Sequence, residues 1–231
     1  MHSFQSVFLA AIMLELERQH NSDVATRING EQLLVLAGIH DTGEGLGGDV
    51  RWTLKQHRIL GPMLEHVEHD LFLDAVIRPL PEEIRATFLH AYELQEHRED
   101  DPTGRFFWAV EMLGYMLRAW NEYLRGGMDL ALDIFWGQKD RIEQFATEYA
   151  SVRIIYGHIR ERIEAARETS EGQAVRAKMQ RRHDGLERAS IEDALRILSA
   201  LDDATCAAML AALQQRPGGN GNGGGDTGTD G

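Results

Sequence analysis

The chain has 231 residues, of which 43% are hydrophobic, enough for one sizeable core with or without an appendage. Its formal net charge of −13 argues against a broad nucleic-acid-binding surface, because a phosphate backbone requires clustered Lys and Arg. The single cysteine, Cys206, excludes an internal disulfide and is no zinc signature, so the cytoplasm is the expected compartment.

The first predicted helix contains the apolar run SVFLAAIML, whose apolar positions follow helical periodicity. No Lys or Arg precedes this run and it is too short to span a bilayer, which argues against a secretory signal and against a membrane protein. A second helix is expected over residues 31–39. The segment GEGLGGDVRW that follows is expected to be a Gly-rich turn.

Further helices are expected over residues 50–56, over 63–77, from 81 onward and over 105–124. Gly61-Pro62 is expected to separate the first two. Pro81-Glu82-Glu83 is a favourable helix start, since Pro suits the first turn and acidic residues favour the helix dipole. Gly126-Gly127 is expected to end the helix over residues 105–124.

From Met128 to about residue 186 the sequence is typical of long, charge-laced amphipathic helix, and two short helices are expected after it. Residues 217–231 are a low-complexity tail that cannot bury a core and is expected to be disordered. No segment shows convincing strand alternation. The sequence therefore predicts an all-α protein with a core at 1–127, a helical extension at 128–216 and the tail at 217–231.

A pattern of polar residues begins where the second helix ends. Adjacent His40 and Asp41 place an imidazole beside a carboxylate, a donor pair suited to divalent transition metals. A His-Asp pair alone arises often by chance. Here, however, the full spacing is H-D-x-x-E-x-x-x-G-D, running through Glu44 to Asp49, and His2-Ser3 precedes the first helix.

These motifs resemble the HD-domain metal-dependent phosphohydrolases, and more closely the branch that contains the bacterial 5′-deoxynucleotidases. In that family a His-Ser at the head of a helix supplies one metal ligand, and a helix-ending His-Asp supplies two more. The segment AVEMLGYMLRAWNEYLRGG is similar to the family block that brings the fourth ligand, whose position falls on Glu111. The resemblance covers residues 2–127 and implies an HD-domain helical bundle with a C-terminal helical extension.

The resemblance also implies roles for individual residues. The ligands implied for a divalent cation (Mn, Co or Mg) are His2, His40, Asp41 and Glu111. Glu44 would orient or deprotonate the attacking water. Asp49 would position the leaving oxygen or hydrogen-bond a ligand, and Lys55 would neutralise phosphate charge.

The sequence departs from the family pattern at two places. Glu111 stands where the family normally has Asp, and its extra methylene displaces the carboxylate oxygens. The family also usually has a helix with an Arg-Trp pair before the first His, whereas this sequence begins at Met1-His2. Either the start is placed too late or the substrate-side wall differs. Arg51-Trp52 lies in a different block and takes no such role.

The function expected from this pattern is metal-dependent removal of phosphate from a small nucleotide, first of all a deoxynucleoside 5′-monophosphate. Hydrolysis of a nucleoside triphosphate or an alarmone stays open, as does a non-catalytic HD-scaffold interaction protein. A homodimer is a further possibility, and neither long nucleic acid nor a membrane is expected as a partner.

Three other features favour ordinary structural interpretations. His66 and His69 share a helix face, but the alternating charges around them are typical of solvated surface rather than of a metal site. The recurring tryptophans favour helix packing over a stacking platform. The positive run RAKMQRRHDGLER is by default a solvated helix, with another subunit or an anion as its alternative partner.

Overall fold

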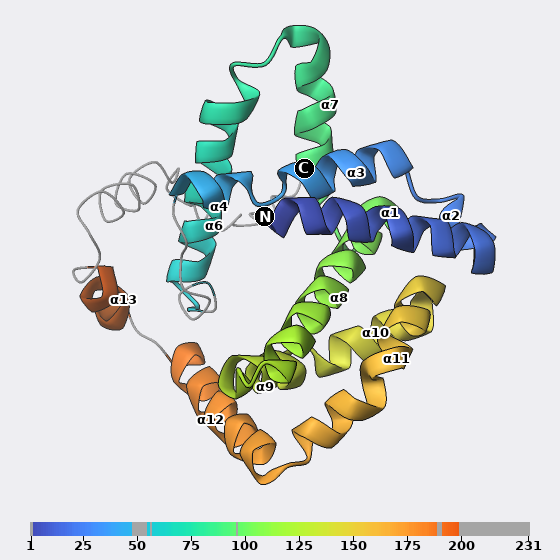
Figure 1. The fold of residues 1–231 in the computed structure, drawn as a ribbon. Coiled ribbons are helices and arrows are strands. Elements are labelled where there is room, and N and C mark those ends of the chain that lie inside the picture. The colour runs from blue at the N-terminus through green and yellow to red at the C-terminus, as the bar shows by residue number, and fades with distance from the viewer. Residues whose placement is uncertain (1, 48–54, 56, 96, 189–190, 199–231) are drawn as a thin grey trace, which may run out of the picture.

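The computed structural model describes residues 2–47, 55, 57–95, 97–188 and 191–198, and every regular element in these ranges is a helix (Figure 1). This confirms the predicted all-α fold. The elements are α1 (His2–His20), α2 (Ser22–Ala25), α3 (Gly30–Ile39), α4 (Thr42–Gly47), α6 (Leu60–Phe72), the π-helix η1 (Leu73–Ile77), α7 (Glu82–Glu93), α8 (Pro102–Leu124), α9 (Met128–Gly137), α10 (Lys139–Glu148), α11 (Ala150–Arg167), α12 (Ser170–Glu187) and α13 (Ile191–Leu198). None of the described helices is both long and apolar enough to cross a bilayer.

Helices α1, α3 and α8 pack together at the centre of the fold. Helices α1 and α3 run antiparallel. The start of α3 lies beside the second half of α1, since a Cβ built on Gly30 would be 2.9 Å from Leu14, and the end of α3 lies beside the first half of α1, since a Cβ on Gly38 would be 3.8 Å from Val7. The start of α1 therefore lies beside the end of α3, as the position of the N-terminus in Figure 1 shows.

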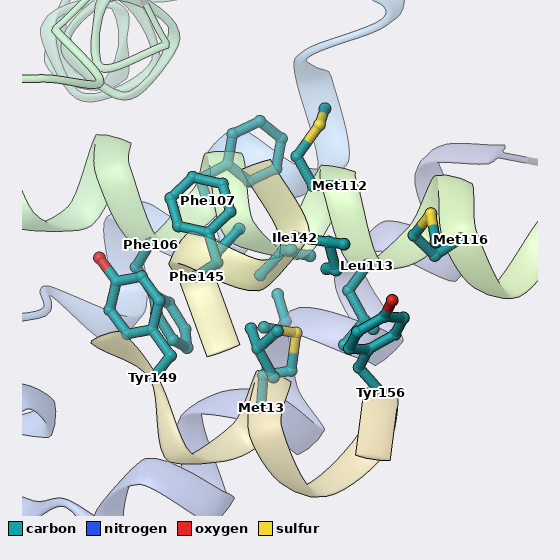
Figure 2. Packing of buried hydrophobic residues seen from close by; sticks show 14 of the residues in the cluster. Met13, Phe106, Phe107, Met112, Leu113, Met116, Ile142, Phe145, Tyr149 and Tyr156 are labelled. Atoms are coloured by element: carbon teal, nitrogen blue, oxygen red, sulfur yellow. The ribbon is translucent and has the colours of Figure 1, made fainter. Parts of the chain in front are cut away.

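The long helix α8 carries most of the core. It begins three residues before the expected start, since the Asp101 side chain accepts hydrogen bonds from the Thr103 and Gly104 N–H groups at 2.7 and 3.0 Å and Pro102 occupies the first turn. Its apolar face packs against α1, α3 and the helices that follow it. Figure 2 shows the centre of this cluster, including the buried side chains Met13, Phe106, Phe107, Leu113, Ile142, Phe145 and Tyr156.

Residues 128–187 form four helices, α9 to α12, rather than one long helix. Gln138 interrupts the chain between α9 and α10, and Tyr149, with φ −116° and ψ 125°, breaks it before α11. These breaks let α9, α10 and α11 fold back onto α8 and bury Phe135 and Val152 in the same core. The boundary expected at residue 127 stays a prediction.

Two other expectations about elements were wrong. Gly61-Pro62 does not separate two helices but lies in the first turn of α6, where proline costs no hydrogen bond because first-turn N–H groups have no intrahelical acceptor. Part of the expected Gly-rich turn is helix α4. The helix expected over 50–56 falls mostly outside the described residues, as does the tail at 217–231.

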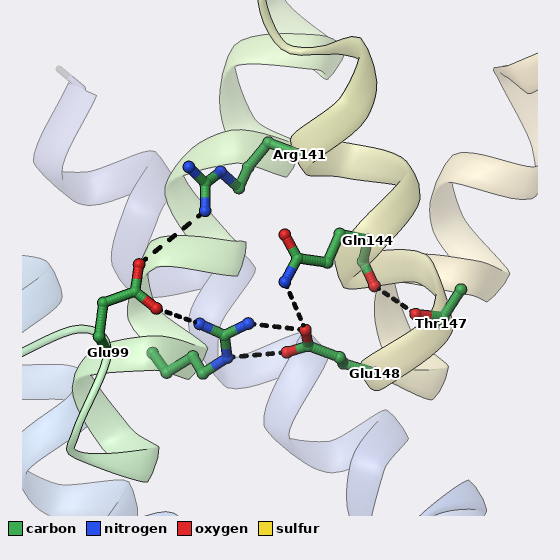
Figure 3. Close-up of polar contacts among 6 residues, drawn as sticks. Glu99, Arg141, Gln144, Thr147 and Glu148 are labelled. Carbon is green, nitrogen blue, oxygen red and sulfur yellow. Dashed lines mark hydrogen bonds and ion pairs between the residues drawn. The ribbon is translucent and has the colours of Figure 1, made fainter.

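A polar network ties the start of α8 to the end of α10 (Figure 3). Arg105 donates to both carboxylate oxygens of Glu148, at 2.8 and 2.6 Å, and to Glu99 at 2.8 Å. Arg141 lies 4.0 Å from the other oxygen of Glu99, and Gln144 donates to Glu148 at 3.1 Å. Both glutamates are therefore already engaged within the protein.

Candidate metal centre

His40 stands at the C-cap of α3, where the rest of the fold fixes its ring. Only 7% of the residue is exposed, and its Nδ1 lies 3.1 Å from the Ala37 carbonyl. The edge of Phe107 meets the imidazole with ring centroids 5.0 Å apart. Because a carbonyl only accepts, Nδ1 carries the ring proton, and the neutral imidazole keeps its lone pair on Nε2.

The carboxylate of Asp41 faces that Nε2 atom. Asp41 Oδ1 lies 3.0 Å from His40 Nε2, and the Asp41 side chain is the more exposed of the two, at 24% against 3%. Divalent transition-metal ions bind imidazole nitrogen and carboxylate oxygen. A metal-binding imidazole usually donates its other ring N–H to a carbonyl or carboxylate, as His40 Nδ1 does to Ala37 here. His40 and Asp41 therefore offer two donor atoms of the kind that a divalent cation requires.

Glu111 adds a second negative charge near His40 from α8. Burial is the largest single influence on the pKa of His40 and lowers it. The Asp41 carboxylate, the Glu111 charge and the Ala37 carbonyl together outweigh burial and raise the pKa above its ordinary value. The surroundings of the imidazole thus favour a positive charge at this position, whether a proton or a cation.

The structure brings together only part of the predicted ligand set. In the described ranges, no group of three or more His, Cys, Asp or Glu side chains is placed to hold a metal ion, and the ligand set of His2, His40, Asp41 and Glu111 stays a prediction. For His2 and Glu44 the structure describes the backbone, at the start of α1 and in α4, but not the side chains. Asp49 lies outside the described residues.

Helix α4 is held tightly against α6. A Cβ on Gly43 would lie 2.5 Å from the Glu68 carbonyl oxygen, closer than real Cβ atoms approach, so only glycine fits this crossing without movement. Glu68 also engages Lys55, whose Nζ donates to Glu68 Oε2 at 3.1 Å. The predicted phosphate-binding lysine is thus anchored to the same helix that supports α4.

The sequence did not predict that Glu68 contacts both α4 and Lys55 beside the candidate metal centre. The alternating charges around His66 and His69 predicted a solvated surface that included Glu68. In the structure His66 is an exposed partner of Asp70, at 3.4 Å, while His69 packs beside Tyr92 with ring centroids 5.5 Å apart. No signal in the sequence distinguishes Glu68 from its neighbours, because its partner Lys55 is 13 residues away.

Comparisons with known proteins add one finding. A family model described as 5′-deoxynucleotidase YfbR-like matches residues 1–159, which include the whole candidate metal centre and continue through α10 into α11. The comparisons with curated proteins and with solved structures gave no match.

Proposed function

The chain belongs to the 5′-deoxynucleotidase YfbR-like family, and on that premise we propose that it removes the phosphate from a deoxynucleoside 5′-monophosphate with the help of a bound divalent cation. Membership makes it a hydrolase of the HD-domain type. The observation that carries the proposal is the facing pair of His40 Nε2 and Asp41 Oδ1, 3.0 Å apart, at the end of α3.

The residues proposed to hold the cation are His2, His40, Asp41 and Glu111. A bound divalent cation supplies Lewis-acid polarisation of the phosphate and lowers the pKa of water. The antiparallel packing of α1 on α3 supports the inclusion of His2, because it brings the first turn of α1 to the end of α3.

In this proposal, Glu44 acts on the attacking water and Asp49 acts on the leaving group. Glu44 lies on α4, directly after the His40-Asp41 turn, and orients the attacking water and accepts its proton. Asp49 positions the leaving 5′-oxygen. The fixed crossing of α4 on α6 at Gly43 supports the role of Glu44, since a general base must be held in place.

Lys55 is proposed to neutralise the phosphate. Its ammonium group is paired with Glu68 in the described conformation, so binding of a phosphomonoester requires it to share or exchange that partner. Its half-buried position, with 16% of the side chain exposed, keeps the charge close to the protein rather than in bulk water.

The activity is tested by measuring phosphate release from a panel of nucleotides with Mn, Co or Mg. The panel contains 5′-dAMP, 5′-dCMP and 5′-dTMP, the ribonucleotide 5′-AMP, 3′-dAMP and dATP. We expect release from the 5′-deoxynucleoside monophosphates and little from the other compounds. Release mainly from dATP, or from none of the compounds, would overturn the assignment.

Glu44→Ala separates the chemical role from metal binding. We expect phosphate release to fall by about 100-fold or more, because general-base catalysis typically contributes about 10²–10⁴-fold, while the metal stays bound. Glu31→Ala is the matched control, since Glu31 is an exposed glutamate in the first turn of α3. Equal activity of Glu44→Ala and the control would contradict the assigned role.

A further inference from the structure

Trp136 is held in a fixed position among the helices that follow α8. It lies in the last turn of α9, and its indole N–H donates to the Gly172 carbonyl of α12 at 2.8 Å. A Cβ on Gly172 would overlap the Arg167 and Ala166 carbonyls at the end of α11, so this close approach requires glycine. The half-buried indole therefore marks a junction of three helices.

Three cationic side chains surround this one indole. The charged groups of Arg176, Lys139 and Arg167 lie 4.7, 5.5 and 6.0 Å from its ring centroid and come from α12, α10 and α11. Within the described part of the chain, none of the three forms an ion pair with a carboxylate. Each gains a cation–π interaction with the ring, but the three like charges repel one another.

Arg167 is the most unusual of the three, because it is buried. Only 1% of the residue is exposed, its Nε donates to the Phe135 carbonyl at 2.8 Å, and its two other guanidinium nitrogens are buried without an acceptor in hydrogen-bonding geometry among the described residues. A buried charge without a matching countercharge is costly to keep. An anion nearby would lower that cost.

The polar groups near Arg167 do not supply this countercharge. Burial raises the pKa of Tyr156, and the neighbouring Arg167 opposes that rise without reversing it, so the hydroxyl stays neutral. Tyr156 donates to Glu143 at 3.3 Å, but Glu143 is already paired with Arg160 at 2.8 Å. Among the described residues, Glu143 forms an ion pair with Arg160 and none with Arg167, so it does not directly neutralise the Arg167 charge.

A second tryptophan provides the comparison. Arg141 lies 3.9 Å and Arg98 5.1 Å from the ring centroid of Trp108, yet Arg141 also reaches the Glu99 carboxylate at 4.0 Å (Figure 3). Cations beside an indole are therefore not unusual in this protein. What distinguishes the Trp136 cluster is that no carboxylate of the described residues forms an ion pair with its members.

We propose that Lys139, Arg167 and Arg176 around Trp136 form a binding site for phosphate groups, separate from the candidate metal centre. Arg176 is exposed and Lys139 is half-buried, so both can contact the anion, while the buried Arg167 contributes its charge without direct access to solvent. Phosphate oxygens prefer several converging cations. Arg167 and Arg176 lie beyond residue 159, outside the family match.

The test is isothermal titration calorimetry of metal-free protein with sodium pyrophosphate and, separately, with 5′-dAMP. We expect saturable binding that weakens as salt is raised, because exposed charges are screened. Arg176→Gln and Lys139→Gln should each weaken binding by about five- to tenfold, the range for one charge-assisted contact. Arg141→Gln, which alters the Trp108 cluster, should bind as the wild type does.

The two probes distinguish the source of the phosphate. Tighter binding of pyrophosphate points to free phosphates, and tighter binding of 5′-dAMP points to a nucleotide. No saturable binding of either probe, or equal binding by the wild type and the Lys139→Gln/Arg176→Gln double variant, would overturn the proposal. Loss of binding in His40→Ala but not in the double variant would also overturn it, by placing the ligand at the metal centre.

Discussion

At the scale of single residues, Glu111 is the decisive member of the proposed ligand set, because its charge reaches His40 from another helix. We predict that Glu111→Ala weakens Mn²⁺ binding by at least about tenfold, since even groups that only support metal ligands contribute that much. The measurement is equilibrium dialysis against Mn²⁺.

Glu122→Ala is the control, because Glu122 is on the same helix and its only described ion-pair partner is the exposed Arg125, at 3.7 Å. If Glu111→Ala and Glu122→Ala bind Mn²⁺ with equal affinity, Glu111 is not a ligand.

Glu17 is a buried residue with a purely structural consequence. Its Oε1 accepts from the Ser151 N–H at 2.7 Å and from the Ser151 hydroxyl at 2.6 Å, which joins α1 to the first turn of α11. Glu17→Ala leaves both donors buried and unpaired, so we predict a loss of about 2–4 kcal/mol in the free energy of unfolding in urea. Glu15→Ala, at an exposed position of α1, should change it little, and a similar effect of both changes would refute this account.

A contact between side chains was predictable from the sequence where the two residues are adjacent in the chain. His40 and Asp41 are neighbours in the chain, so their spacing alone places an imidazole beside a carboxylate. The Lys55–Glu68 and Glu17–Ser151 pairs join residues 13 and 134 positions apart. Such pairs depend on how helices pack, which no local pattern encodes.

At the scale of elements, the crossing of α4 on α6 links packing to the proposed function. A Cβ on Gly43 would meet backbone, not a movable side chain, so we predict that Gly43→Ala displaces α4 and lowers stability by about 1–3 kcal/mol, with a loss of phosphate release. Thermal unfolding and phosphate release measure the two effects.

Gly38→Ala is the matched control for Gly43→Ala. A Cβ there would lie 3.8 Å from Val7, an ordinary contact, and alanine favours helix over glycine by up to about 1 kcal/mol. We expect Gly38→Ala to be neutral or stabilising. If Gly43→Ala behaves in the same way, the tight crossing does not constrain α4.

Element boundaries were predictable where capping residues mark them. Gly126-Gly127 follows the observed end of α8, as expected, and Asp101-Pro102 explains why that helix starts before residue 105. The charge-laced stretch after Met128 carries no comparable signal. Its division into four helices follows from apolar residues such as Phe135 and Val152 entering the core of α8.

At the scale of the whole molecule, one apolar core joins the N-terminal helices to the helices that follow residue 127. The candidate metal centre lies where α3 ends and α8 passes, and the Trp136 cluster lies among α9 to α12. An overall charge of −13 does not reveal this separation of acidic and basic sites, because it averages over all surfaces.

The central claim is that a divalent cation binds at His40 and Asp41. It is tested most directly by measuring Mn²⁺ bound per chain in the wild type and in His40→Ala, with circular dichroism showing that both are folded. The account predicts one Mn²⁺ per chain in the wild type and none in His40→Ala at the same free Mn²⁺ concentration. A wild type without bound Mn²⁺, or a His40→Ala variant that binds it equally well, would contradict the account.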